Sequence, residues 1–192
     1  MKITVGVSAR HVHLTEEIYE KLFGDTNLVK KADLDQPGQF ASESVITIKN
    51  GDRQINNVRV IGPLRDYNQI EVSRTDCYTL KVNPPVRSSG DVFGSKPITL
   101  VGPKGEVTLE EGLIIASRHI HISKEEKERY GLSDINKVCI RVDGEKAGIM
   151  KNVYLIEREP SNFALHLDTD DANAFNIKTG DKVEVLIEKN NI

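Results

Sequence analysis

The 192-residue sequence contains no tryptophan, and aromatic residues make up only 5% of it. This scarcity argues against a protein that stacks single-stranded bases on aromatic side chains. The formal net charge is -3, whereas a protein that binds nucleic acid by neutralising phosphates needs a basic excess. We therefore expect no nucleic-acid partner.

Long hydrophobic runs are also missing. No run approaches the roughly 18 residues that a membrane-spanning helix needs, so no membrane partner is expected. The N-terminal segment lacks an apolar core followed by a small-residue cleavage site, so we expect no secretory signal. The two cysteines, Cys77 and Cys139, lack Cys-x-x-Cys spacing and are expected to be free thiols in the cytoplasm. Phosphate-binding, dinucleotide-binding and Gly-x-Ser-x-Gly motifs are absent as well.

What the sequence does contain is a series of short segments that alternate apolar and polar residues, separated by Gly, Pro, Asn and Asp. Such segments are typical of β-strands joined by tight turns, and their number favours small β-barrels over a βαβ fold. The predicted strands are Met1–Ser8, Ser44–Lys49, Asn57–Ile61, Gln69–Ser73, Thr79–Val82, Ile98–Val101, Leu113–Ser117, Lys137–Val142, Val153–Ile156, Ala164–His166 and Lys182–Ile187.

Helices are few and short in the prediction. Thr15–Phe23, Ser123–Tyr130 and Thr169–Phe175 each begin at or just after a residue that can cap a helix, with acidic residues in the first turn. The sequence therefore indicates a mainly β protein with short capping helices.

An internal repeat organises the chain. Residues 10–15 read Arg-His-Val-His-Leu-Thr, and residues 118–123 read Arg-His-Ile-His-Ile-Ser. Each copy runs from a strand through a capping residue into a short acidic helix. Two related half-molecules, each a small barrel, follow from this pattern.

Four of the five histidines lie in the two repeats, as His11 with His13 and His119 with His121. Two residues apart on a strand, side chains share one face and lie about 6.6 Å apart along the chain. Two imidazoles placed in this way can bind one metal ion, and neutral imidazole is a good zinc ligand. Histidines with ordinary structural partners are the alternative. The fifth histidine, His166, precedes an acidic helix and gains interest only from the other four.

Two further residues offer complementary chemistry. Glu71 lies on the polar face of a predicted strand and is a weak candidate metal ligand, because such faces are most often simply solvated. Arg65, in the preceding turn, has a guanidinium that can hold phosphate oxygens in a fork, although a surface arginine is the commoner case.

The loop Pro84–Ser95 combines a cation, hydroxyl groups and glycines, among them Arg87, Ser89 and Gly90. Glycines expose backbone N–H groups that can bind an anion, so the loop is a candidate for binding phosphate or coenzyme A. An ordinary turn explains the same residues equally well.

Five segments together resemble the phosphate propanoyltransferases, or PduL-type phosphotransacylases. The segments are 8–14, 65–71, 86–95, 117–121 and 166–174, and the resemblance runs in order over nearly the whole chain. It implies a reversible reaction in which an acyl-CoA and phosphate give an acyl phosphate and coenzyme A.

The resemblance also implies a site with two zinc ions. One ion would be held by His11, His13 and Glu71. The other would be held by His119, His121 and His166. Arg65 would contact phosphate, and both acyl-CoA and phosphate would be substrates.

In architecture, the resemblance implies two six-stranded β-barrels and a homodimer. Residues 9–116, with an insertion at about 23–43, would form the first barrel. Residues 117–192 would form the second, joined by the N-terminal strand of residues 1–8. That exchange would bring both His-x-His pairs to one cleft.

Relatives that work inside protein-shelled microcompartments carry an N-terminal extension before the first strand. Here a strand is predicted from the first residues, so a cytoplasmic enzyme acting on acetyl-CoA or propionyl-CoA is expected at least as much as one of propanediol metabolism inside a microcompartment. A zinc-dependent hydrolase of a phosphoester or thioester is one alternative reading. A non-enzymatic metal-binding barrel or a purely structural barrel are the others.

Overall fold

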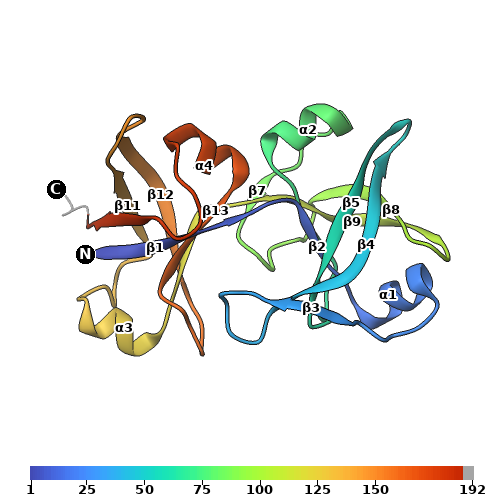
Figure 1. The fold of residues 1–192 in the computed structure, drawn as a ribbon, viewed down its shortest axis with the longest axis horizontal. Helices are drawn as coiled ribbons and strands as arrows, with labels where there is room; N and C mark the ends of the chain where they lie inside the picture. The colour runs from blue at the N-terminus through green and yellow to red at the C-terminus, as the bar shows by residue number, and fades with distance from the viewer. Residues whose placement is uncertain (188–192) are drawn as a thin grey trace. The chain divides into compact units, whose positions relative to one another are not determined.

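The computed structural model describes residues 1–187 and is mainly β, with four short helices (Figure 1). The chain divides into two compact units. The N-terminal unit is Ala9–Ala116, and the C-terminal unit combines Met1–Ser8 with the chain from Ser117 onward.

The N-terminal unit contains a closed ring of six strands. Pairing runs β9-β6-β2-β5-β4-β8 and returns from β8 to β9, while β3 and β7 extend its edges. The elements are β2 (His11–His13), α1 (Glu16–Phe23), β3 (Lys30–Asp33), β4 (Phe40–Asn50), β5 (Arg53–Gly62), β6 (Gln69–Glu71), α2 (Arg74–Leu80), β7 (Val86–Arg87), β8 (Lys96–Val101) and β9 (Glu106–Ala116).

The C-terminal unit is a second closed barrel with the strand order β1-β13-β10-β12-β11-β14. Its elements are β1 (Lys2–Ser8), β10 (His119–Ile122), α3 (Lys124–Arg129), β11 (Lys137–Val142), β12 (Gly148–Glu157), β13 (Ala164–Asp168), α4 (Thr169–Phe175) and β14 (Lys182–Leu186). The predicted fold of two six-stranded barrels with short helices is thus confirmed.

Each barrel has its own hydrophobic core, because alternate strand residues point inward. In the N-terminal unit Val12 and Ile70 are fully buried, and in the C-terminal unit Ile120 and Leu165 are fully buried. Val12 and Ile120 are the residues between the paired histidines. The expectation that they turn away from the histidine face into a core is therefore confirmed.

Both barrels take a strand from the other repeat of the chain. The predicted exchange of the N-terminal strand is confirmed, since β1 pairs with β13 and β14 although it leads directly into β2 of the N-terminal barrel. In the same way, β9 pairs with β6 and β8 although it leads directly into β10 of the C-terminal barrel. The exchange is reciprocal, and each His-x-His strand begins where the chain passes from one barrel to the other.

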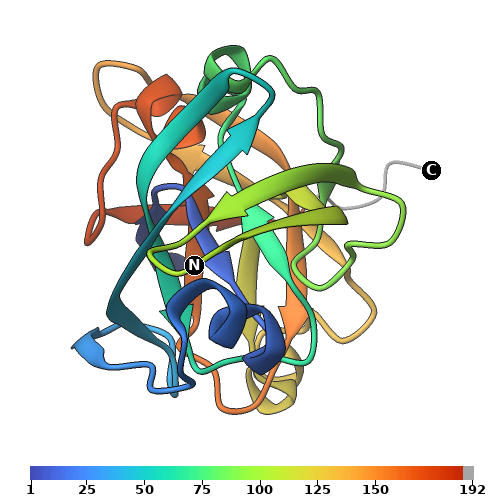
Figure 2. The same ribbon diagram turned by 90° about the vertical axis from the view of Figure 1, so that its right-hand side faces the viewer.

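Helix α1 packs closely against the β8–β9 turn, and the two lie side by side in Figure 2. The backbone N–H of Lys104 donates to the carbonyl of Leu22 at 3.0 Å. A Cβ added at Gly102 would lie 2.4 Å from that same carbonyl oxygen. Only glycine allows this approach, which fixes the segment that follows the first His-x-His strand.

The three predicted helices are present as α1, α3 and α4, with ends within one residue of the expectation. The predicted strand Thr79–Val82 is wrong, because helix α2 covers Arg74–Leu80. Its cause is a capping box, in which Ser73 and Asp76 bond reciprocally to each other's backbone N–H. Local hydrogen bonding at the helix start outweighs the alternating pattern of the last turn.

None of the helices in the described part of the chain has the length and hydrophobicity to cross a bilayer. Cys77 and Cys139 are both buried free thiols, as expected.

Candidate functional site

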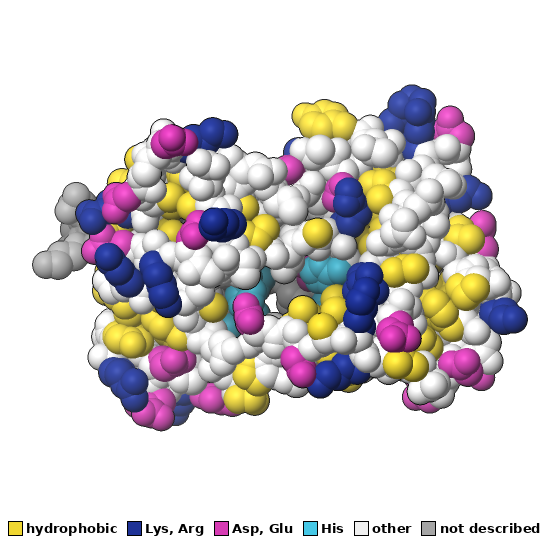
Figure 3. Space-filling model, viewed as in Figure 1, with side chains coloured by type: hydrophobic (Ala, Val, Ile, Leu, Met, Phe, Trp, Pro, Cys, Tyr) yellow, Lys and Arg dark blue, Asp and Glu magenta, His cyan; other side chains and the backbone are white. Residues whose placement is uncertain are grey.

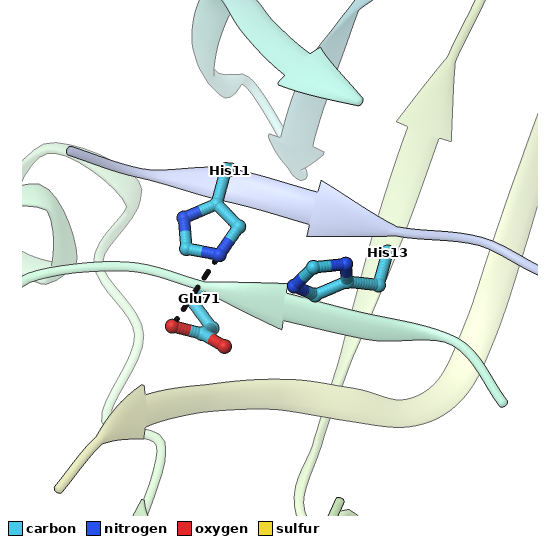
Figure 4. A group of neighbouring side chains, drawn as sticks. All are labelled: His11, His13 and Glu71. Carbon is cyan, nitrogen blue, oxygen red and sulfur yellow. Dashed lines mark ion pairs between the residues drawn. The ribbon is translucent and has the colours of Figure 1, made fainter. Parts of the chain in front are cut away.

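The β2–β6 pairing assembles the first candidate metal site in the N-terminal unit. In this antiparallel register His11 lies opposite Glu71, and His13 lies opposite Gln69. Because Val12 turns into the core, both imidazoles lie on the other face of the sheet. Figure 4 shows a ring nitrogen of each histidine pointing toward the Glu71 carboxylate.

The spacing of these side chains fits a zinc ion. One ligand atom from each of His11, His13 and Glu71 can be chosen so that all lie within 4.8 Å of one another. The Nε2 of His11 is 3.5 Å from the Oε2 of Glu71. Ligand atoms bound tetrahedrally at zinc distances lie about 3.3 Å apart. Two imidazoles and a carboxylate are also a donor set that zinc accepts.

Outer hydrogen bonds orient the leading histidine of each pair. The Nδ1 of His11 lies 2.9 Å from the carbonyl oxygen of Ala9, and the Nδ1 of His119 lies 2.8 Å from that of Ser117. A carbonyl can only accept, so each Nδ1 carries the proton and each Nε2 presents a lone pair. This tautomer, held by a backbone carbonyl, is the usual arrangement of a metal-binding histidine.

Protonation favours ligand formation at His13. Burial lowers the pKa of His13 to about 3, helped by the positive charges of His11 and Arg65. His13 is therefore neutral near pH 7, which is the form that binds metal. Burial also lowers the pKa of His11, but the Glu71 carboxylate outweighs it through charge and hydrogen bonding, so the pKa of His11 is raised above 6.5.

The C-terminal unit repeats this arrangement on β10 and β13. His119 lies opposite His166 in the antiparallel register, and His121 lies opposite Ala164. The ring centroids of the three histidines lie 4.7 to 5.2 Å apart in pairs. His119 and His121 are buried. The structure thus brings together the second predicted set of three histidines.

An ion pair ties each His-x-His strand to a helix. Arg10 donates from Nε to Asp76 at 3.0 Å, and Arg118 donates to both oxygens of Asp171 at 2.9 and 2.7 Å. Each aspartate is the third residue of a helix that begins just after the strand bearing the third candidate ligand. The arginine before each first histidine therefore fixes the two strands of its site to each other.

Arg65 lies beside the first triad. Its positive charge lowers the pKa of both His11 and His13. Its Nη1 donates to the Tyr67 hydroxyl at 2.7 Å, and its guanidinium carbon lies 5.4 Å from the centre of the Tyr67 ring. A cation held next to a metal site is suited to binding an anionic substrate.

The loop of residues 88–95 is anchored at both ends. Gly90 donates its N–H to the Oε1 of Gln69 at 2.7 Å, and Gly94 donates its N–H to Glu111 at 2.8 Å. Arg87 pairs with Asp91 at 2.9 Å. The glycine N–H groups that the sequence offered to an anion are thus already used within the protein.

Sequence reasoning missed four residues that support the two triads. Gln69 and Tyr67 contact Glu71 and Arg65, and Asp76 and Asp171 hold the two arginines. One signal was available. Ser73 and Asp76 follow Glu71 at the same spacing at which Asp168 and Asp171 follow His166. The repeat therefore extends to the strand and helix that carry the third ligand.

The charges around these units are mixed. Positive and negative side chains are interspersed over the face shown in Figure 3, and neither sign dominates it. A selective charge is therefore found locally, in the immediate surroundings of the candidate ligands.

Comparison with known proteins gives consistent results. A family model described as phosphate propanoyltransferase matches residues 4–178, which include every candidate ligand. A relative from Thermotoga maritima is 45% identical over 186 residues, covering 96% of this chain and 89% of the relative.

A relative from Lachnoclostridium phytofermentans is 46% identical over 188 residues, covering 96% of this chain and 87% of the relative. One from Salmonella typhimurium is 40% identical over 173 residues, covering 90% and 82%. All three are named phosphate propanoyltransferase.

Proposed function

The chain belongs to the phosphate propanoyltransferase family of acyltransferases, and on this premise we propose that it transfers a short acyl group, propanoyl or acetyl, reversibly between coenzyme A and inorganic phosphate. The products in one direction are an acyl phosphate and free coenzyme A. The observation that carries the proposal is the match over residues 4–178, which spans both candidate metal-binding triads.

Two zinc ions per chain are part of this proposal. His11, His13 and Glu71 would hold one, and the residues of the second triad, His119, His121 and His166, would hold the other. The histidine tautomers and the close spacing of the first triad support it. When bound, zinc supplies Lewis acidity and keeps a coordinated thiol in its thiolate form.

Arg65 would bind the phosphate. A guanidinium fork matches two phosphate oxygens, and its charge offsets the negative charge that develops on the oxygens of the tetrahedral intermediate. The Tyr67 hydroxyl, 2.7 Å from Nη1, would hold the guanidinium in one orientation. Arg87, Ser89 and Gly90 belong to the loop that we assign to the phosphate or coenzyme A side of the site.

Transfer would be direct, in a complex that holds both substrates. A phosphate oxygen attacks the thioester carbonyl carbon, the new C–O bond forms, the C–S bond breaks, and coenzyme A leaves as the thiolate. No cysteine is required as a nucleophile. Both cysteines are buried, and Cys77 lies in the hydrophobic core of the N-terminal unit.

We further expect a cytoplasmic homodimer, with association with a microcompartment less expected. Light scattering of the purified protein measures the subunit number, and fractionation of cells measures the location.

The deciding experiment is a kinetic assay with acetyl-, propionyl- and butyryl-CoA, with and without phosphate. Phosphate-dependent loss of the thioester, with one acyl phosphate formed per thioester consumed, supports acyl transfer. Thioester loss without phosphate indicates the alternative hydrolase, and no turnover of any thioester indicates a non-enzymatic barrel. Full activity after zinc is removed by a chelator would contradict the metal assignment.

A further inference from the structure

Gln69 is a polar side chain that the proposed reaction does not use, although it lies within the first triad. It is fully buried on β6, directly opposite His13. A buried amide is costly unless its hydrogen-bonding groups are satisfied, so its partners indicate what it is for.

Those partners join the triad to the loop. The Nε2 of Gln69 donates to the Oε1 of Glu71 at 2.6 Å and to the hydroxyl of Ser89 at 2.9 Å. Its Oε1 accepts from the backbone N–H of Gly90 at 2.7 Å. The orientation of the amide is fixed, because the Gly90 N–H can only donate and the Glu71 carboxylate accepts.

This arrangement gives the two oxygens of Glu71 different roles. Oε1 is bound to Gln69, whereas Oε2 faces the Nε2 of His11 at 3.5 Å. A carboxylate held in this way offers a metal one oxygen in a fixed direction. Support of a ligating carboxylate by an outer hydrogen bond typically changes metal affinity by about 10–100-fold.

The amide is planar, so its contacts cannot change independently. The same NH₂ group bonds both Glu71 and Ser89. A rotation that follows the carboxylate therefore moves the groups that hold residues 88–90. The C-terminal unit lacks this link, because the residue opposite His121 is Ala164, which has no polar side chain.

We propose that Gln69 is a positioning residue that fixes Glu71 as a one-oxygen metal ligand and couples metal occupancy at His11, His13 and Glu71 to the ordering of residues 88–95. The inference rests on the metal site of the proposed function. It adds that the site governs the loop assigned to phosphate or coenzyme A.

The test combines zinc titration against a chromophoric chelator with hydrogen exchange of residues 88–95, in zinc-free and zinc-loaded protein. Gln69→Met removes the amide at nearly constant volume. Gln54→Met is the matched control, because Gln54 is an exposed glutamine on β5 of the same unit. Ser89→Ala removes one loop contact and leaves the Glu71 contact in place.

In the wild type, zinc should slow exchange in residues 88–95. In Gln69→Met the affinity for one of two zinc equivalents should fall about 10–100-fold, and loop exchange should no longer respond to zinc. Gln54→Met should match the wild type. Ser89→Ala should keep zinc affinity within about threefold and at least halve the zinc response of the loop, which makes it informative even if Gln69→Met does not fold.

Unchanged zinc affinity in Gln69→Met overturns the positioning role, and an unchanged loop response in Ser89→Ala overturns the coupling. Both results leave the metal site itself intact. A wild-type protein that binds no zinc is a different outcome, because it overturns the metal assignment of the proposed function together with the inference.

Discussion

The two units build their candidate sites from the same parts but complete them differently. In both, a His-x-His strand pairs with a strand that carries a third ligand, a backbone carbonyl orients the first histidine, and an arginine bonds to an aspartate in a helix. In the N-terminal unit the third ligand is Glu71, supported by Gln69. In the C-terminal unit it is His166, and Ala164 replaces the supporting glutamine.

This difference separates a shared scaffold from a variable chemistry. Three neutral imidazoles leave a divalent ion its two positive charges, whereas a carboxylate ligand neutralises one of them. The outer contacts also differ, since only the Glu71 side is bonded through an amide to a loop. The two sites should therefore respond in parallel to changes in the scaffold and differently to changes near the third ligand.

Removing one ligand from each unit is the strongest test of this comparison. His11→Ala and His119→Ala should each lower bound zinc from two equivalents to one and reduce acyl transfer by orders of magnitude, because each removes a direct ligand. Elemental analysis measures the zinc, and circular dichroism verifies the fold. A variant that keeps two equivalents would remove its triad from the proposed site.

The arginine pairs test whether the shared scaffold is equally strong in both units. Arg118 makes two bonds to Asp171, and Asp171 raises the pKa of Arg118 mainly through a hydrogen bond, whereas Arg10 makes one printed bond of 3.0 Å to Asp76. Lysine keeps the charge but not the fork. Arg118→Lys should therefore cost about 1–2 kcal/mol of unfolding free energy, and Arg10→Lys about half of that.

Urea denaturation of the two variants, compared with the wild type, measures this difference. Equal losses would show that the second bond of Arg118 contributes nothing, and a larger loss in Arg10→Lys would reverse the assignment.

Protonation of the zinc-free protein sharpens the comparison further. The pKa of His13 is lowered to about 3, so the neutral form is favoured in the folded state and its contribution to stability is present above about pH 6.5. That contribution is lost as the pH falls below 6.5, by at most about 1.4 kcal/mol per pH unit. The pKa of His11 is raised, so its contribution is present below 6.5 and is lost as the pH rises through the folded pKa.

The stability of zinc-free His13→Gln should accordingly fall less steeply between pH 6.5 and 5 than that of the wild type, as measured by denaturant midpoints. His11→Gln should change the slope in the opposite sense. NMR titration of the rings gives the same information directly, and a His13 ring that titrates near pH 6.5 would refute the assignment.

Much of the fold followed from local sequence signals. Turn residues and alternating strands indicated small barrels, and the Arg-His-x-His repeat indicated two related halves. The register that places His11 opposite Glu71 could not be predicted from local patterns, because strand pairing depends on contacts distant in sequence. Glu71 therefore remained a weak candidate until a family resemblance was added.

The supporting residues were hidden for the same reason. Gln69 appeared as part of a polar strand face, yet it is fully buried, since the loop of residues 88–95 covers it and bonds to it. The Ser73–Asp76 capping box converts an apparent strand into helix α2 and thereby presents Asp76 to Arg10. Both features combine a local pattern with a distant partner.

The smallest expected effect concerns the helix caps that follow the third ligands. Ser73 caps α2 and Asp168 caps α4, so replacing either by alanine should cost about 1 kcal/mol. The caps differ in charge, and burial raises the pKa of Asp168. A raised pKa means that the charged form is disfavoured on folding, so stability from this group declines as the pH rises above 3.8.

Asp168→Asn keeps an oxygen that can accept the capping hydrogen bond and removes the buried charge. Its unfolding free energy at pH 7 should therefore equal or exceed that of the wild type, while Asp168→Ala and Ser73→Ala should both fall below it. Thermal or urea denaturation measures the three variants side by side. If Asp168→Asn were as unstable as Asp168→Ala, the carboxylate itself would be required, and its attraction to Arg118 would have to outweigh its burial.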